Sequence, residues 1–273
     1  MPNDKLRITR RGRLILLAVT GVVVAAAVAV LAVLLIGGGD SGQKPPLVIP
    51  EGWRAVQVYA ASDKSLGVAP GTTEKAAGAA SLKLPSEARG NPEGYLFPAT
   101  YPIDAQTTPA GLLTYMVNTA NRHFGADHIT QGARRNDVTV YQTVTIASIV
   151  QAEADTTADM GKVSRVIYNR LAQGMPLQMD STLNYALNRS TLDTTTGDTK
   201  IDSPFNTYER KGLPPTPIGN PGQDAMNAAI NPTPGNWLYF VTVAPGDTRF
   251  TDSYSEQQKN VQEFNRNQKS ARS

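Results

Sequence analysis

The sequence of 273 residues contains no cysteine and only two histidines. Without cysteine the chain cannot be a disulfide-stapled scaffold, a zinc finger, a thiol protease or an iron–sulfur protein. Two histidines cannot build a histidine-rich metal site alone. Because no histidine follows His128, a serine–histidine–aspartate triad would lack its base in the C-terminal half. Neither a P-loop nor a G-x-G-x-x-G motif is present. We therefore expect no metal and no cofactor, and carboxylates remain for acid–base chemistry.

An excess of positive charge is confined to the start of the chain. The formal net charge is +3, but residues 1–13 contain five basic side chains and one acidic one, a net +4. The remaining residues therefore sum to −1. This distribution argues against a basic face that binds nucleic acid.

Residues 14–36 form an uncharged stretch in which Thr20 is the only hydroxyl side chain. As a helix this stretch would span roughly 34 Å, enough to cross the hydrocarbon core of a bilayer. By the positive-inside rule the basic tail, residues 1–13, is cytoplasmic and residues 37–273 lie outside the membrane. A cleaved signal peptide is the alternative, but its apolar region is usually shorter, about 7–15 residues. We expect a single-pass anchor in the plasma membrane.

A linker and a small module are expected next. Residues 37–47 begin with glycines and end near a Lys-Pro-Pro sequence, a composition typical of a linker. Residues 48–90 show weak hydrophobic periodicity, with a short strand expected near Val48 and a helix over residues 54–62. Alone, these residues predict a surface module of unknown role.

Residues 92–101 contain three aromatic side chains between prolines: Tyr95, Phe97 and Tyr101. The prolines exclude a helix interior here. The aromatic rings either plug the core or form a wall for sugar stacking, because pyranose rings present apolar C–H faces. Composition leaves both interpretations open.

The helix predicted over residues 139–154 is apolar around most of its circumference, which is typical of a buried helix. Glu153 follows Ile149 by four residues, so its carboxyl lies on the apolar face. Burial disfavours the charged form of a carboxyl group and raises its pKa, which suits a general acid near neutral pH. The alternative is a helix-end glutamate that faces water or pairs with Arg165 or Arg170.

Periodicity and turn residues predict further elements. Helices are expected over residues 109–124, 160–173, 180–186, 223–230 and 255–267, and strands over residues 237–243 and 248–251. In the helix over residues 160–173, we expect Lys162, Arg165 and Arg170 to face outward. Asp180 or Ser181 should cap the next helix.

Several of these motifs occur together in one known family. Residues 147–153, ASIVQAE, resemble the A-S-I-V-x-x-E segment of the YceG-like endolytic murein transglycosylases, the MltG family. Residues 93–98 resemble the family's E-G-[FYW]-x-[FW]-P-D-T segment, although Ala99 stands where the family commonly has Asp. Further similarity follows in the same order through residues 163–171, 174–182, 206–208, 212–215, 217–218, 220–222 and 238–240.

This resemblance implies an α+β fold. It implies a small LysM-like module before an α+β catalytic domain, and both would follow the transmembrane helix expected from the uncharged stretch. Residues 50–52 resemble the start of the LysM-like module, so residues 48–90 would be that module in a shortened form, and residues 91–273 the catalytic domain.

The implied activity is cleavage of the β-1,4 bond between N-acetylmuramic acid and N-acetylglucosamine within nascent glycan strands. The products carry 1,6-anhydro-muramoyl ends, and elongation of the strand stops. The implied partners are peptidoglycan strands and peptidoglycan synthases. By resemblance Glu153 is the catalytic acid and base.

Five further residues are candidates for substrate binding: Glu93, Tyr95, Asp180, Asn206 and Tyr208. Asp180 is a sugar ligand or a helix cap. The amide of Asn206 and the phenol of Tyr208 either bind acetamido and hydroxyl groups or stabilise a local turn. Two other functions stay open, a muramidase-type hydrolase that uses a second carboxylate and a non-catalytic wall-binding scaffold.

Overall fold

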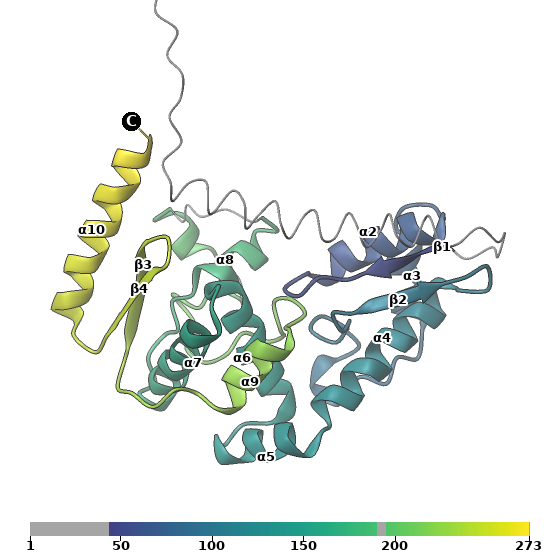
Figure 1. Ribbon diagram of the computed structural model, residues 1–273, viewed down its shortest axis with the longest axis horizontal. Coiled ribbons are helices and arrows are strands. Elements are labelled where there is room, and N and C mark those ends of the chain that lie inside the picture. The colour runs from purple at the N-terminus through teal and green to yellow at the C-terminus, as the bar shows by residue number, and fades with distance from the viewer. Residues whose placement is uncertain (1–43, 190–194, 273) are drawn as a thin grey trace, which may run out of the picture. The chain divides into compact units, whose positions relative to one another are not determined.

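The structure is a computed structural model that describes residues 44–189 and 195–272 (Figure 1). The expected cytoplasmic tail over residues 1–13, the expected transmembrane helix over residues 14–36 and the start of the expected linker lie outside the described residues. Within the described part of the chain, no helix combines the length and the apolar character needed to cross a membrane.

The described residues contain both helices and strands, which confirms the mixed α+β class. The strands form two separate antiparallel pairs, β1 with β2 and β3 with β4. In chain order the elements are β1 (Lys44–Val48), α2 (Ala55–Leu66), α3 (Thr72–Ala79), η1 (Ser86–Ala88), β2 (Thr100–Ile103), α4 (Pro109–Phe124), α5 (Asp127–Arg135), α6 (Val140–Glu153), α7 (Thr157–Ala172), α8 (Asp180–Ala186), η2 (Asp198–Lys200), α9 (Gln223–Ile230), β3 (Tyr239–Ala244), β4 (Asp247–Thr251) and α10 (Tyr254–Arg272).

Strands β1 and β2 form a small sheet at one side of the described chain, next to α2, α3 and α4 (Figure 1). Leu47 pairs with Tyr101 in this sheet, and both side chains are buried. Residues 44–47 of the expected linker therefore belong to a strand, because the apolar side chain of Leu47 packs in the core. The expected boundary between residues 90 and 91 falls between two strands of one sheet, and contacts group Lys44–Ser273 as one compact unit.

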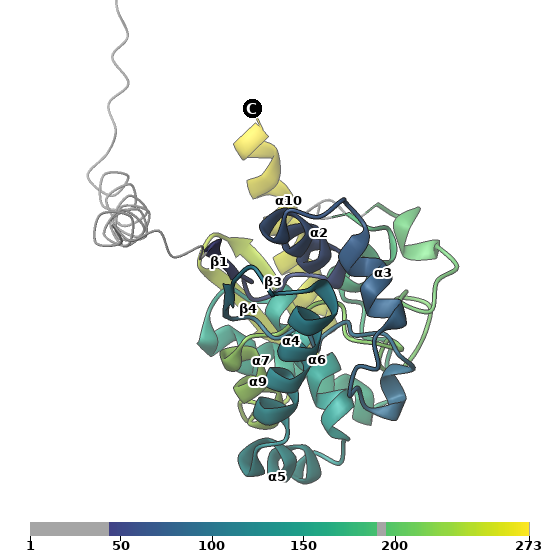
Figure 2. The same ribbon diagram turned by 90° about the vertical axis from the view of Figure 1, so that its right-hand side faces the viewer.

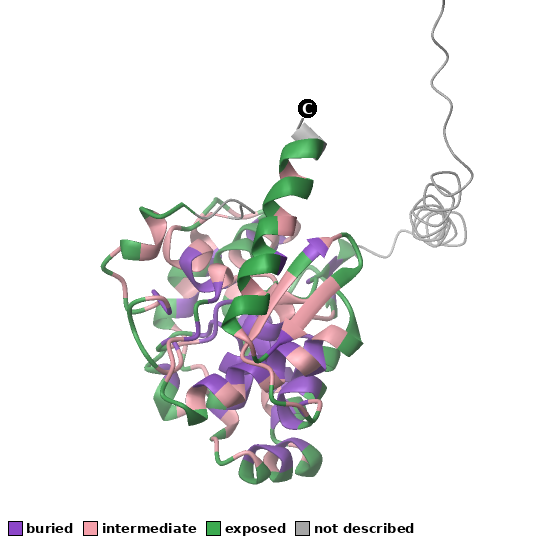
Figure 3. Ribbon diagram, turned by 90° about the vertical axis from the view of Figure 1, so that its left-hand side faces the viewer, coloured by how far each residue is buried: buried purple, intermediate pink, exposed green. Residues whose placement is uncertain are grey.

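Helix α6 lies at the centre and packs against α7 and α9. Its start is set by Thr139, whose side chain accepts the Gln142 N–H, while the Gln142 side chain accepts the Thr139 N–H. This reciprocal cap satisfies two backbone donors that helix geometry leaves unpaired. Buried residues are concentrated in the central helices, whereas α10 is largely exposed (Figure 3). The prediction that the helix over residues 139–154 is buried is therefore confirmed by α6.

Among the α-helices and strands of the described residues, three have no counterpart among the predictions: α3, α5 and β2. Helices α3 and α5 are short and bury mainly small side chains, so neither contains a run of large apolar residues at helical spacing. In α5, Gly132 lies so close to Ile230 that a Cβ atom added to the glycine would be 2.4 Å from the isoleucine Cβ. The close packing of α5 on α9 therefore depends on the absence of a side chain at Gly132, which a hydrophobic pattern does not show.

Asn220 joins three segments that are distant in the sequence. Its side chain is fully buried, its Nδ2 donates to the Trp53 carbonyl at 2.7 Å, and its Oδ1 accepts the Leu96 N–H at 2.8 Å. Close by, Gly94 has a φ of +83°, and a Cβ atom there would lie 2.5 Å from the Cβ of Pro217. Glycine is therefore required for the loop of residues 92–98 to meet the segment after residue 212.

Strands β3 and β4 form a hairpin, and α10 packs along β3. In two perpendicular views α10 lies beside this hairpin and runs out to the C-terminus (Figures 1 and 2). The hairpin and the closing helix agree with the predicted strands and helix, with the helix longer at both ends than expected.

Candidate active site

Glu153 is the last residue of α6 and is partly exposed. Its Oε1 accepts a hydrogen bond from the backbone N–H of Ser181 at 3.1 Å. Burial of the carboxyl raises the pKa of Glu153, and the negative charge of Asp180 raises it further, while hydrogen bonds from Ser181 act in the opposite direction. The net shift is upward. The geometry thus gives a carboxyl that is oriented by a backbone donor and retains its proton to a higher pH than usual.

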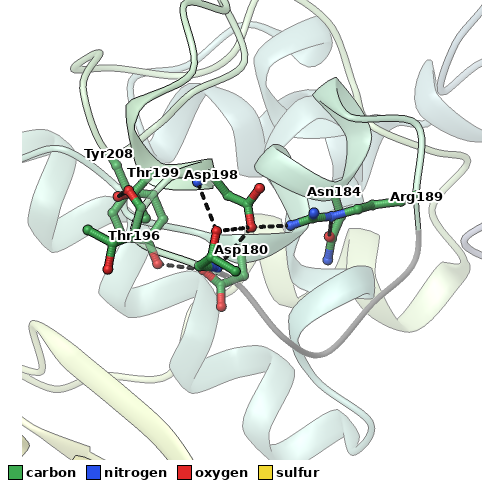
Figure 4. A network of polar contacts seen from close by, with 8 residues as sticks. Asp180, Asn184, Arg189, Thr196, Asp198, Thr199 and Tyr208 are labelled. Atoms are coloured by element: carbon green, nitrogen blue, oxygen red, sulfur yellow. Dashed lines mark hydrogen bonds and ion pairs between the residues drawn. The ribbon is translucent and has the colours of Figure 1, made fainter.

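Helix α8 brings two neighbouring residues to this carboxyl. Met179 occupies the cap position and no side chain caps the helix, so the prediction of a cap at Asp180 or Ser181 is wrong. The Ser181 N–H is engaged by Glu153 instead. The Asp180 carboxylate accepts a hydrogen bond from the Tyr208 hydroxyl (Figure 4). Burial and this contact raise the pKa of Tyr208, so the phenol remains a donor.

Neither arginine proposed as a partner of Glu153 reaches it. Arg165 donates to the carbonyl oxygens of Pro232 and Thr233. Arg170 is 5% exposed and donates to backbone carbonyls around it. The expectation that Arg170 faces outward is therefore wrong, because the segment after α7 and the start of β3 surround its guanidinium with acceptors. Among the ion pairs of the described residues, none includes Glu153.

Asn206 lies in the loop that leads to Tyr208 and is fully buried. Its Nδ2 donates to the carbonyl oxygens of Thr199 and Ile201, and its Oδ1 accepts the Tyr208 N–H. The side chain therefore stabilises the local turn and places Tyr208. These contacts fit the alternative in which Asn206 stabilises a local turn.

Tyr95 is 3% exposed and belongs to the core. Its ring stacks on Tyr141 with centroids 6.1 Å apart and meets the edge of Phe124 at 5.4 Å. In the same loop, Phe97 stacks on His123 at 4.2 Å. The burial of Tyr95 agrees with the core-plug interpretation of this loop.

Glu93 is 4% exposed, and its carboxylate contacts other parts of the fold. Its Oε1 accepts the Ala55 N–H at the start of α2, and its Oε2 accepts the Tyr185 hydroxyl of α8, both at 3.0 Å. The guanidinium of Arg54 lies over the Tyr185 ring, 5.2 Å from its centroid. Glu93 therefore connects α2 to α8. The first two residues of α8 are those that contact Glu153 and Tyr208. Burial raises the pKa of Glu93 to about 7 despite its hydrogen bonds.

Glu93→Gln should remove a pH dependence of stability. Between pH 4.5 and about 7 the folded state holds a proton on Glu93 that the unfolded chain releases, so the free energy of unfolding falls as pH rises through this range. The contribution of this carboxyl is at most about 3 kcal/mol. Urea midpoints of wild type and variant at pH 5 and pH 7.5 measure it. The exposed Glu74→Gln is the control, and an equal difference between Glu93→Gln and wild type at both pH values would contradict the assignment.

A second polar network closes the segment after α8. Arg189 forms an ion pair with Asp198 of η2 at 2.6 Å, and Asp198 also accepts hydrogen bonds from Thr195 (Figure 4). The Arg189 contact lowers the pKa of Asp198 to about 2. The Nε of Arg189 also donates to the Oδ1 of Asn184 in α8 at 3.2 Å (Figure 4). The network thereby ties α8 to the loop that carries Asn206.

The structure brings Glu153, Asp180 and Tyr208 together and leaves Glu93, Tyr95 and Asn206 in supporting positions. The sequence did not predict that the backbone N–H of Ser181 orients Glu153 or that Arg170 is buried among backbone carbonyls. A backbone donor has no signature in the sequence, but the short Asp-Ser-Thr run after Pro176 is a usable signal for a helix start. In the part of the chain that the structure describes, no group of three or more potential ligand side chains could hold a metal ion.

Comparisons with known proteins agree on one family. The model of the YceG-like family matches residues 25–263. The chain is 37% identical over 173 residues to the endolytic murein transglycosylase of Bacillus subtilis (strain 168), which covers 63% of this chain and 48% of that protein. It is 37% identical over 184 residues to the protein of the same name from Streptococcus pneumoniae serotype 2 (strain D39), which covers 65% of this chain and 33% of the relative. The chain thus matches half or less of the length of these curated relatives.

A solved structure is also similar. The crystal structure of a YceG-like protein from Listeria monocytogenes has a TM-score of 0.68 and 30% sequence identity. The match covers 79% of this chain and 75% of the other. The similarity in fold therefore extends well beyond the immediate surroundings of Glu153.

Proposed function

Because the chain belongs to the YceG-like family, we propose that it is an endolytic lytic transglycosylase of peptidoglycan. It would cleave the β-1,4 bond between N-acetylmuramic acid and N-acetylglucosamine inside nascent glycan strands. The observation that carries this proposal is the Glu153 carboxyl, whose pKa is raised and which the Ser181 N–H orients. The names of the B. subtilis and S. pneumoniae relatives support the same activity.

One carboxyl can perform both steps of this reaction. Protonated Glu153 donates its proton to the glycosidic oxygen as the bond from that oxygen to C1 of the muramoyl residue breaks. The resulting carboxylate then takes the proton of the muramoyl C6 hydroxyl while O6 forms a bond to C1. The product end is a 1,6-anhydro sugar, no water is consumed, and Glu153 is again protonated.

Asp180 and Tyr208 would support Glu153. The negative charge of Asp180 raises the pKa of Glu153, which favours the protonated starting state. Tyr208 donates to Asp180 and so fixes the direction of that carboxylate. The remaining acceptor capacity of Asp180 would bind a sugar hydroxyl, as the sequence suggests.

Mass spectrometry of digested glycan strands tests the reaction class. We expect new ends with the mass of 1,6-anhydro-N-acetylmuramic acid after incubation with the purified protein. Reducing ends, which carry the mass of one more water, would favour a muramidase-type hydrolase. Absence of new ends would favour a non-catalytic wall-binding protein.

The rate of cleavage should fall as pH rises through the raised pKa of Glu153, because only the protonated carboxyl starts the reaction. Asp180→Asn removes a nearby negative charge, so this alkaline limb should move to lower pH and persist. At its optimum pH, the Asp180→Asn variant should cleave about tenfold more slowly than wild type, the effect of one lost hydrogen bond to a charged group. Rates against pH for both proteins on the same strands provide the measurement. If Asp180→Asn is as inactive as a variant without the Glu153 carboxyl, a two-carboxylate mechanism is favoured.

We also propose that residues 14–36 anchor the chain in the plasma membrane with residues 1–13 in the cytoplasm. The uncharged stretch and the preceding basic cluster support this topology. The active site would then lie on the side of the membrane where peptidoglycan and its synthases are found. Protease added to intact spheroplasts should digest the chain beyond residue 43, and full protection would contradict the proposed topology.

The unit of β1, α2, α3 and β2 is proposed as the LysM-like module. Its two strands pair with each other, and α2 packs on both β1 and α3. Residues 92–98 lie between α3 and β2, so this module would contribute the Glu93 contact to α8. Leu47→Asp should disrupt the pairing of β1. If wild type binds undigested peptidoglycan and this variant does not, a glycan-binding role is supported. Equal binding by both proteins would contradict it.

A further inference from the structure

A hollow of about 740 Å³ lies beside the first turns of α6, in addition to the site at its last turn. Its lining includes Tyr141 and Thr145 of α6 and residues 212–216. Thr145 precedes Glu153 by eight residues, which corresponds to about 12 Å along the helix axis. Residues 212–216 follow Tyr208 in the sequence. One continuous segment therefore leads from the candidate active site to the hollow.

The hydroxyl of Tyr141 is the unusual feature of this hollow. The residue is 6% exposed, and its Oη has no hydrogen-bond partner among the described residues. Buried polar groups in folded proteins nearly always have a partner, so an unpaired one marks a position where a ligand or water belongs. Tyr141 and Glu87 also line a smaller hollow of about 370 Å³, so the two hollows meet at this tyrosine.

The charged groups of the hollow are balanced. Glu87 and Arg89 both line it, and the electrostatic effect of each reaches the Tyr141 hydroxyl. A carboxylate or phosphate ligand would meet the like charge of Glu87. A neutral ligand with hydroxyl groups can donate to the carboxylate and accept from the guanidinium at the same time.

Part of the lining is apolar. Leu171, Leu213, Pro214 and Pro215 contribute it. A lining that combines polar groups with rigid apolar groups matches a pyranose ring, which has hydroxyls at its rim and C–H groups on its faces. The strands β1 to β4 do not line the hollow, so it lacks an edge on which a peptide could add a strand.

We propose that this hollow is a second carbohydrate site, which holds a neutral N-acetylhexosamine of the same glycan strand at a distance from Glu153. The proposal rests on the proposed function for the identity of the strand. Binding energy from this site is available only to strands long enough to reach both positions. The enzyme should therefore favour long strands over short ones.

Binding of β-1,4-linked N-acetylglucosamine oligomers tests the site without cleavage. The full chain carrying Glu153→Gln is titrated with the hexamer and with the dimer, alone and together with Tyr141→Phe or Arg89→Gly. Tyr141→Phe removes only the unpaired hydroxyl, and Arg89 has a φ of +49°, where glycine is well tolerated. Tyr254→Phe on α10, with Tyr254 62% exposed, is the matched control.

We expect Tyr141→Phe to weaken hexamer binding about 3- to 10-fold, the effect of one neutral hydrogen bond. Arg89→Gly should weaken it about tenfold or more, because the hydrogen bond lost is that of a charged group. Dimer binding and the Tyr254→Phe control should change less than about twofold. Melting temperatures should show that Tyr141→Phe folds, since it leaves no buried group unpaired. Equal hexamer binding by both variants and the parent would overturn this inference. The proposed function is judged separately by anhydro ends in the wild-type digest, so failure of one leaves the other measurable.

Discussion

Glu153→Gln should lower the rate of glycan cleavage about 10²- to 10⁴-fold, the usual contribution of a general acid–base group. The amide has nearly the shape of the carboxyl and can still accept the Ser181 N–H, so the local structure should persist. It can neither donate a proton to the glycosidic oxygen nor take one from the C6 hydroxyl. Initial rates of release of anhydro ends by the purified variant and wild type give the ratio.

Asp155→Asn is the matched control for this experiment. Asp155 is an exposed residue two positions after Glu153, and its substitution likewise replaces a carboxyl group by an amide. It should retain the wild-type rate within about twofold, since surface substitutions have small effects. Circular dichroism of both variants checks that they fold. Near wild-type turnover by Glu153→Gln would show that the catalytic assignment is wrong.

Arg170→Met should lower the free energy of unfolding by about 3–5 kcal/mol. The guanidinium donates to the carbonyl oxygens of Leu238, Pro176 and Leu177, and it also lies over the Tyr239 ring. Methionine fills much of the volume of the arginine stem but donates no hydrogen bond. Each carbonyl left buried and unpaired costs about 1–3 kcal/mol. Urea unfolding of variant and wild type measures the difference.

Arg210→Met serves as the control for the loss of a guanidinium. The side chain of Arg210 is 56% exposed and pairs with Asp202, which is 95% exposed. Such exposed pairs contribute about 0–1 kcal/mol, so this variant should remain close to wild type. If the free energy of unfolding falls by the same small amount in both variants, Arg170 does not organise the segment that leads from α7 to α8. If only Arg170→Met is destabilised, a lower cleavage rate in that variant is explained by displacement of α8.

Local patterns predicted the helices that have a strong apolar face and a clear start or stop. The bounds of α4 and α9 agree with the sequence prediction, and α4 begins after Thr108, whose side chain accepts the Gly111 N–H. These features depend on residues within a turn or two of each other, so a sequence contains them in full. The position of Glu153 at the end of an apolar helix could be predicted from the sequence for the same reason.

Three buried polar residues, two in loops and one in α7, were harder to interpret. Glu93, Asn206 and Arg170 are each buried, although residues of these types are usually exposed. Their burial depends on partners from distant segments, such as Ala55 and Tyr185 for Glu93. A residue type by itself cannot distinguish a side chain that binds substrate from one that satisfies backbone groups inside the fold.

The sequence by itself determined the order of the main helices, the family and the carboxyl most suited to acid–base chemistry. These depend on short-range spacing, on the apolar faces of helices and on motifs whose order can be read along the chain. Only the tertiary structure decided which polar side chains stand at the site and which support it. The Ser181 N–H, the Asp180–Tyr208 contact and the burial of Tyr95 arise from packing between segments that are far apart in sequence. Hydrogen bonds and desolvation act over a few ångströms in space, so their effect on a pKa or on access to a sugar is set when those segments meet.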